Sequence, residues 1–345
     1  MEEPNVDNPT HQPHSPFNLL LSRSYTRLQF IRACLQHKGI NITNASYLTS
    51  SVRTSTQSQY EHVWKVFCQF CHSKDFSKVT DNLIISFFDH LIRIKGLKAK
   101  TLLSYKSALI DPLKYGFNFD ITNDIITKSL RGMANLYPET RYRAPDWSLD
   151  LVLQYIVHNN HDNSLLFNTR KTLFLVGLAL GSRVSELFAL MRDKNSLSRR
   201  PDGSFEIYQD PQFLAKNEDP LNRRGPVIIN PLPGDSNVLC PCKSLSNYLN
   251  LTKKTKSSHL FVHPVHLGKW NLAAMRLAIV RFIKSSQPLS LARAHDLRKV
   301  ATSLAFFSKM NIDTINKKMG WKSRKVFLKH YLHRVKELHH RCSTI

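Results

Sequence analysis

Apolar residues recur every three or four positions over four consecutive stretches in the first part of the chain, a pattern typical of amphipathic α-helices. In the first stretch, which begins at Thr54, Tyr60, Val63, Trp64 and Phe67 share one face. The other three stretches cover residues 83 to 96, 98 to 115 and 124 to 136. Four such helices within about eighty residues predict a compact helical bundle.

The segments that flank this bundle lack the helical period. Residues 1 to 50 are rich in Pro, Asn, His and Ser, and we expect them to be mostly disordered apart from a short helix that starts near Arg27. Residues 138 to 149 contain two prolines and no apolar period, which is typical of an interdomain linker. The bundle therefore occupies residues 51 to 137.

Beyond the linker, residues 150 to 345 predict a second, mixed domain. Helical patterns cover residues 150 to 157, 165 to 180, 242 to 255 and 270 to 285. Between them, residues 203 to 232 alternate or run apolar with β-branched side chains and turn residues, which predicts a small sheet. The predicted fold class is mainly α with a small β-sheet, divided into a helical bundle and a mixed α/β domain.

The net charge of the chain indicates the kind of partner that it binds. The chain of 345 residues has 49 Lys or Arg and 25 Asp or Glu, a formal net charge of +24. An excess of this size favours a polyanion as the partner, although a solvated basic surface is the alternative. Residues 281 to 345 alone contain 15 basic and 3 acidic residues. The longest apolar run is too short to span a bilayer, and the acidic N-terminus does not have the pattern of a signal peptide.

Six cysteines in a chain of this length do not have the pattern of a secreted disulfide framework. Cys68 and Cys71 have a spacing seen in zinc sites, but they also fall at helical spacing with Trp64 and Phe67. Packing on a helix face is the favoured interpretation, and we predict no metal site.

The candidate chemistry lies near the C-terminus. His295 and Arg298 are three positions apart, so on a helix they would point into one space and offer donors to an anionic group. Trp321 and Tyr331 follow, and a phenol beside phosphate-binding donors suggests phosphoryl transfer through a covalent intermediate. Each residue also has a structural alternative, since a lone Tyr or Trp is usually part of a core.

These residues carry a resemblance. The motifs HDLRKVATSLAF and GWKSRKVFLKHYL, together with LALGSRVSELFAL around Arg183, resemble the tyrosine recombinase (phage-integrase) family over about residues 50 to 340. The segments FLAKNE and LCPCKSL are most similar to the eukaryotic branch of this family, which is carried by DIRS-like retrotransposons and Crypton elements. The resemblance implies a SAM-like core-binding bundle followed by a catalytic domain.

The resemblance also implies a catalytic set. Two guanidiniums would neutralise the scissile phosphate, His295 would donate to it or take the phenolic proton, Trp321 would donate its indole N–H, and Tyr331 would be the nucleophile. A lysine in the sheet turn would be the general acid, and Lys216 is the best match, although Arg223 and Arg224 lie in the same turn. The expected catalytic residues are Arg183, Lys216, His295, Arg298, Trp321 and Tyr331.

Supporting residues follow from position. Glu186 lies three residues after Arg183, so it would either simply pair with that arginine or orient the site as well. The third helix of the bundle and the linker carry basic and hydroxyl side chains suited to DNA contacts. The expected DNA-binding residues are Lys98, Lys100, Thr101, Ser104, Lys106, Arg141 and Arg143.

The function implied is site-specific DNA recombination, the integration or excision of a mobile element through a 3′-phosphotyrosyl intermediate. Double-stranded DNA is the expected partner, with a tetramer on paired sites, no membrane, no small-molecule cofactor, and the nucleus as the location. Two alternatives stay open. One is strand cleavage and religation like that of a type IB topoisomerase, and the other is a domesticated DNA-binding protein without catalysis.

Overall fold

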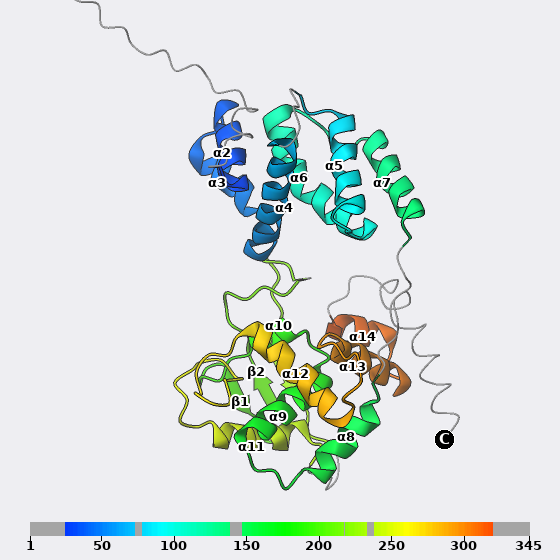
Figure 1. Cartoon of the computed structure of the whole chain (residues 1–345). Helices are drawn as coiled ribbons and strands as arrows, with labels where there is room; N and C mark the ends of the chain where they lie inside the picture. The colour runs from blue at the N-terminus through cyan, green and yellow to red at the C-terminus, as the bar shows by residue number, and fades with distance from the viewer. Residues whose placement is uncertain (1–24, 73–77, 139–146, 217, 233–237, 320–345) are drawn as a thin grey trace, which may run out of the picture. The chain divides into compact units, whose positions relative to one another are not determined.

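The computed structural model describes residues 25–72, 78–138, 147–216, 218–232 and 238–319. The chain divides into two compact units, Met1–Arg141 and Tyr142–Ile345, and each unit has its own large hydrophobic core. Both are built mostly of helices, and the second also holds a small sheet (Figure 1). The predicted fold class, mainly helical with a small sheet, is confirmed. No helix in the described part of the chain is long and apolar enough to cross a membrane.

Aromatic side chains make the core of the first unit. The Phe30 and Trp64 ring centroids lie 4.8 Å apart, and those of Phe67 and Phe87 lie 5.1 Å apart. Burial of these faces is the main stabilising contribution, about 25 cal/mol for each Å² of apolar surface. The helices described in this unit are α2 (Arg27–His37), α3 (Ile42–Ser50), α4 (Thr54–His72), α5 (Asp81–Arg93), α6 (Ala99–Phe117) and α7 (Asp124–Leu136).

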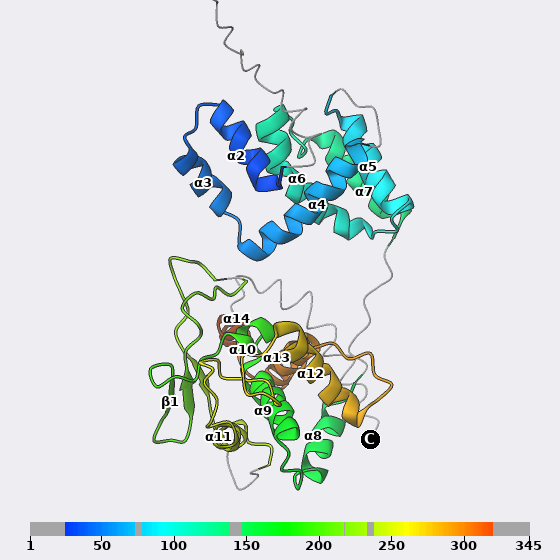
Figure 2. The same cartoon turned by 60° about the vertical axis from the view of Figure 1, so that its left-hand side comes forward.

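The short helix expected to start near Arg27 is formed as α2, whereas the expectation of disorder is wrong for residues 42–50, which form α3. Helices α2 and α3 lie side by side in the views of Figures 1 and 2, and α2 also packs against α4 and α6. Arg27 anchors α2, because its buried guanidinium pairs with Asp111 at 3.0 Å and donates to the Ala108 carbonyl at 2.8 Å. Residues 1–24 lie outside the described residues.

The cysteine pair of α4 packs on the core side of that helix. Cys71 is 1% exposed and Cys68 is partly buried, as the helical spacing predicts. Burial raises the pKa of both thiols to about 12. At neutral pH the two side chains are therefore small apolar groups rather than thiolates.

Helix α9 is the central element of the second unit. Leu173, Phe174 and Val176 are fully buried in it, and the helix packs against α11, α12, α13 and β3. At the entrance to the unit, Trp147 is buried and the Ser148 backbone exchanges two hydrogen bonds with the Gln287 side chain. The helices described in this unit are α8 (Leu149–His158), α9 (Leu165–Leu180), α10 (Val184–Phe188), α11 (Pro241–Leu251), α12 (Leu272–Ser286), α13 (Asp296–Phe307) and α14 (Ile312–Met319).

The sheet has three short antiparallel strands in the order β1 (Leu197–Arg199), β2 (Phe205–Ile207) and β3 (Val227–Ile229). Strands β2 and β3 lie within the predicted range of residues 203 to 232, whereas β1 lies before that range and was not predicted. Ile207 and Ile229 turn their side chains into the core. The sheet therefore packs against α9 through strand β3.

The predicted sheet range of residues 203 to 232 includes the segment just before Lys216, but no strand forms in that segment, and Lys216 lies in an exposed turn between β2 and β3. Glu218 organises this turn. Its carboxylate accepts the Ala215 N–H at 2.8 Å and the Arg224 N–H at 2.7 Å. Because a side chain takes these backbone donors, they do not pair with a neighbouring strand.

Candidate active site

A sharp turn after α9 positions the first candidate residue. Gly181 ends the helix with φ of +59°, a left-handed conformation that favours glycine. A Cβ atom added at Gly181 would collide with the Met319 side chain. The chain can therefore reverse tightly here, and Arg183 becomes the residue that precedes the first turn of α10.

Glu186 holds two arginines together. Its Oε1 pairs with Arg183 Nη1 at 2.7 Å, and its Oε2 accepts the Arg183 backbone N–H at 2.7 Å and faces Arg298 Nη1 at 3.4 Å. The Arg183–Glu186 pair was expected from their spacing, whereas the link to Arg298 was not. In this arginine cluster of Arg183, Glu186 and Arg298, two positive charges share one carboxylate, so its net charge is +1.

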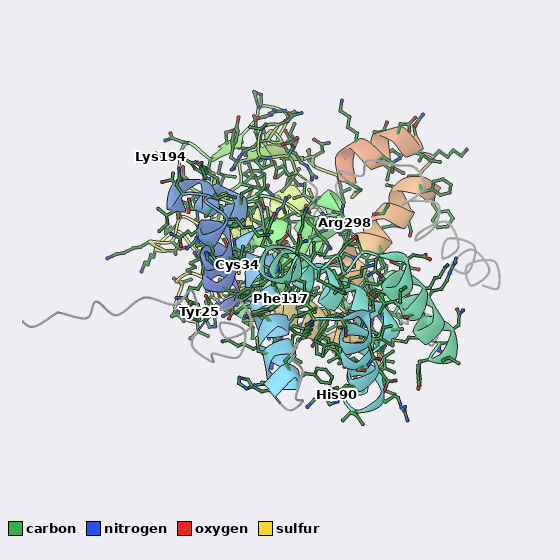
Figure 3. All side chains as sticks on the ribbon, turned by 90° about the horizontal axis from the view of Figure 1, so that it is seen from above. Tyr25, Cys34, His90, Phe117, Lys194 and Arg298 are labelled. Carbon is green, nitrogen blue, oxygen red and sulfur yellow. The ribbon has the colours of Figure 1, made fainter. Side chains whose placement is uncertain are left out.

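Arg298 lies beneath the surface of the site, with its side chain 3% exposed. Its Nη1 donates to the Gly181 carbonyl at 2.8 Å and its Nη2 to the Met319 carbonyl at 2.6 Å. A charge buried this deeply is tolerated only when carboxylate and carbonyl oxygens compensate its lost hydration. These contacts fix the guanidinium where α9, α13 and α14 meet (Arg298 is labelled in Figure 3).

His295 immediately precedes α13, three residues before Arg298, as predicted. Partial desolvation lowers its pKa below the ordinary 6.5, and the charges of Lys299, Arg298 and Arg183 lower it further, while Asp296 acts in the opposite direction. The imidazole is therefore neutral at pH 7, and it can accept a proton on one nitrogen and donate from the other.

Arg183 and His295 line one pocket, here called the His295 pocket, of about 570 Å³. Arg276 from α12 and Arg293 from the loop before α13 line it as well. No lining residue in the described part of the chain is acidic. A basic concave surface with a neutral imidazole at its edge suits an oxyanion such as a phosphodiester.

Sequence reasoning missed Arg276 and Arg293. Both are exposed basic residues, and nothing in their local spacing distinguishes them from other surface arginines. Arg276 approaches Arg183 because α12 packs against α10, and the loop that follows α12 brings Arg293 to the same pocket. The proximity of Arg276 and Arg293 to Arg183 therefore depends on tertiary packing, which a local sequence motif does not reveal.

The remaining predicted catalytic residues have different outcomes. Lys216 is not among the residues that line the His295 pocket. Trp321 and Tyr331 lie outside the described residues. The structure thus brings together Arg183, Glu186, His295 and Arg298, and the roles of the other three predicted residues remain predictions.

The predicted DNA-binding residues of the bundle lie at the start of α6. Lys98, Lys100 and Ser104 are exposed, and Lys106 donates to the Thr127 hydroxyl at 3.1 Å. Between α6 and α7 is a largely apolar groove of about 460 Å³, with Lys100, Lys106 and Arg131 among its lining residues. Thr101 is half-buried in the same turn as Lys98 and Lys100. Arg141 and Arg143 lie outside the described residues.

No protein-family model matches the sequence, and no curated protein matches it. Solved structures do match the fold. XerH site-specific recombinase bound to a palindromic difH substrate is 12% identical, with a TM-score of 0.58 over 93% of this chain and 86% of that one. The Tn1549 transposon integrase in complex with transposon right end DNA is 15% identical, with a TM-score of 0.58 over 89% of this chain and 95% of that one.

A lambda integrase dimer bound to a COC′ core site is 16% identical, with a TM-score of 0.53 over 91% of this chain and 79% of that one. These neighbours are tyrosine recombinases and integrases. At such identities the likeness concerns the fold, and the chain has the fold of tyrosine recombinases.

Proposed function

We propose that this protein is a site-specific DNA recombinase that integrates or excises a mobile element through a tyrosine nucleophile. The observation that carries the proposal is the arginine cluster beside His295. One buried carboxylate holds Arg183 and Arg298, which are distant in sequence, together, and Arg183 lines a basic pocket with His295. Such a cluster on a tyrosine recombinase fold favours phosphoryl transfer on DNA over the binding of a neutral ligand.

The arrangement supports a division of labour between the two arginines. Arg183 lines the pocket and would donate directly to a non-bridging phosphate oxygen. Arg298 lies behind it and would add positive charge from below, which stabilises the extra negative charge of the pentavalent transition state. The neutral His295 would accept the phenolic proton or donate to the phosphate.

The reaction would then run as a transesterification. Tyr331 oxygen would form a bond to phosphorus while the bond to the 5′-oxygen breaks, Lys216 would protonate that oxygen, and Trp321 would donate to the phosphate. Because the phosphotyrosyl bond keeps the energy of the phosphodiester, a second strand's 5′-hydroxyl can reverse the step without ATP.

The proposal extends to the assembly and the setting. Solved neighbours include a lambda integrase tetramer bound to a Holliday junction, and exchange between two duplexes requires four active sites. We therefore propose a tetramer on paired DNA sites. The sequence resemblance to DIRS-like and Crypton recombinases favours a eukaryotic mobile element and residence in the nucleus.

The test is covalent capture. Nicked duplexes that tile the genomic DNA on both sides of the reading frame are incubated with the full chain, denatured, and retained only if protein is attached. We expect the wild type to retain one or a few sequences, and Tyr331→Phe and Arg183→Gln to retain none.

Two other outcomes would contradict the proposal. Covalent retention of duplexes without sequence preference would indicate cleavage, rotation and religation of one strand, like the reaction of a type IB topoisomerase. Tight, salt-dependent binding without any covalent adduct would indicate a DNA-binding protein that has lost its chemistry.

A further inference from the structure

The second unit contains another basic pocket, here called the hairpin pocket. It has a volume of about 620 Å³ and lies between residues 254–259 and residues 266–269. Its charged lining groups include Lys254, Lys256 and Lys269. No lining residue in the described ranges is acidic, and within those ranges none of these lysines forms an ion pair. The pocket therefore concentrates positive charge that the protein itself does not neutralise.

One wall of this pocket is a constrained hairpin. Leu267 has φ of +55°, which is strained for a branched side chain, and a Cβ added at Gly268 would lie 2.9 Å from His266 Nδ1. The Thr255 hydroxyl donates to the Leu267 carbonyl and so ties this hairpin to the opposite wall. Backbone strain of this kind persists only where the surroundings maintain it, and it often accompanies binding sites.

Two stacked imidazoles fix the tip of the hairpin. The rings of His263 and His266 are parallel within 1°, with centroids 4.1 Å apart. Each Nδ1 accepts a backbone N–H, from Val265 at 3.2 Å and from Gly268 at 3.1 Å. Because Nδ1 of His266 accepts a backbone N–H, its Nε2 is the ring nitrogen that can donate at the pocket.

The hairpin pocket is joined to the candidate active site through α10. Phe188, the last residue of α10, stacks against His259, with ring centroids 5.2 Å apart. The Lys269 Nζ atom lies 5.7 Å from the centroid of the Phe188 ring. Arg183 immediately precedes the helix. Helix α10 has five residues and, at a rise of about 1.5 Å per residue, is roughly 8 Å long, so Arg183 and Phe188 lie at opposite ends of one short helix.

We infer that the hairpin pocket binds a second backbone phosphate of the DNA duplex whose reacting phosphate occupies the His295 pocket. Lysine ammonium groups, hydroxyls and an imidazole N–H are phosphate donors. Because one short helix carries both Arg183 and Phe188, neighbouring phosphates of a single duplex can reach the two pockets together. The inference rests on the proposed function, because it takes DNA as the ligand of the first pocket.

Salt-dependent DNA binding tests the assignment without chemistry. The full chain carrying Tyr331→Phe is titrated with a generic duplex at several salt concentrations, alone and with Lys254→Gln and Lys256→Gln together. We expect the pair to weaken binding roughly fivefold and to reduce the slope of log K against log salt by about 1. The matched control is Lys253→Gln, an exposed lysine of the same run that does not line the pocket.

The outcomes separate this inference from the proposed function. If Lys253→Gln lowers the slope as much as the pocket pair does, the hairpin pocket is not a phosphate site, although recombination stands. If the parent chain does not bind duplex DNA at all, both fail. A free-anion site is tested without DNA: if inorganic phosphate raises the melting temperature only when Lys254 and Lys256 are present, and the DNA slopes are equal, the DNA assignment is overturned.

Discussion

Replacement of Glu186 by Gln isolates the link between the two arginines. The side chain is 6% exposed and interacts with Arg183 twice at 2.7 Å and with Arg298 at 3.4 Å. Glutamine keeps the shape but removes the charge, and it places an amide N–H₂ group toward one of the guanidiniums. The perturbation therefore removes the carboxylate charge that Arg183 and Arg298 share and creates no cavity.

The expected cost follows from these contacts. A hydrogen bond to a charged group contributes about 1.5–3 kcal/mol, and the loss of one partner from a buried ion pair costs about 3–5 kcal/mol. Because the glutamine carbonyl can still accept one of these bonds, we expect Glu186→Gln to destabilise the second unit by about 3 kcal/mol. That equals a roughly 150-fold change in the local opening constant.

Hydrogen exchange measured by peptide mass spectrometry suits a chain with two units, because each peptide reports its own unit. The matched control is Glu206→Gln, which removes the same charge from an ion pair with Arg200 at 2.9 Å that is partly exposed. We expect this control to cost less than about 1 kcal/mol. Equal loss of protection of α9 and α13 in both variants would refute the bridging role of Glu186.

Three further predictions follow from the described residues. Since the pKa of His295 is lowered, the neutral form is lost only below pH 6.5, so the acid limb of kcat/KM for DNA cleavage should lie below pH 6.5, and a limb above that value would be contrary to the assignment. Gly181→Ala should lower the melting temperature, because it adds about 1–2 kcal/mol of backbone strain and a contact with Met319, whereas Gly132→Ala, within a helix and with open space around it, should not. Cys71, with a pKa of about 12 and 1% exposure, should react with iodoacetamide only after unfolding, and rapid labelling of the native chain would show that its thiol is accessible.

Local patterns predicted the elements that have strong local signals. Helices α4 to α7 begin and end close to the predicted positions because each has an apolar face of period 3.6. Thr80 accepts the Leu83 N–H at 3.2 Å and caps α5, as expected from the residue type. By contrast, α3 has mostly polar residues, and only Ala45 and Thr49 are buried. Its helix depends on packing against α2, which is a tertiary contact.

The site divides in the same way. His295 and Arg298 are three residues apart, and this spacing predicts that the Arg298 charge acts on the imidazole. The same spacing predicts the pairing of Arg183 with Glu186. The contact between Glu186 and Arg298 joins residues 112 positions apart, so no local period reveals it. The segment before Lys216 does not form a strand, although its apolar residues favour one, because the Glu218 carboxylate accepts the backbone N–H groups of Ala215 and Arg224.

Peptide mapping of the captured adduct shows whether Tyr331 becomes covalently linked to DNA. Trypsin releases a peptide that covers residues 330–334, in which Tyr331 is the one hydroxyl-bearing side chain. We expect this peptide to carry the mass of a 3′-linked nucleotide after nuclease digestion. An adduct on any other residue, or cleavage that leaves no adduct, would contradict this expectation.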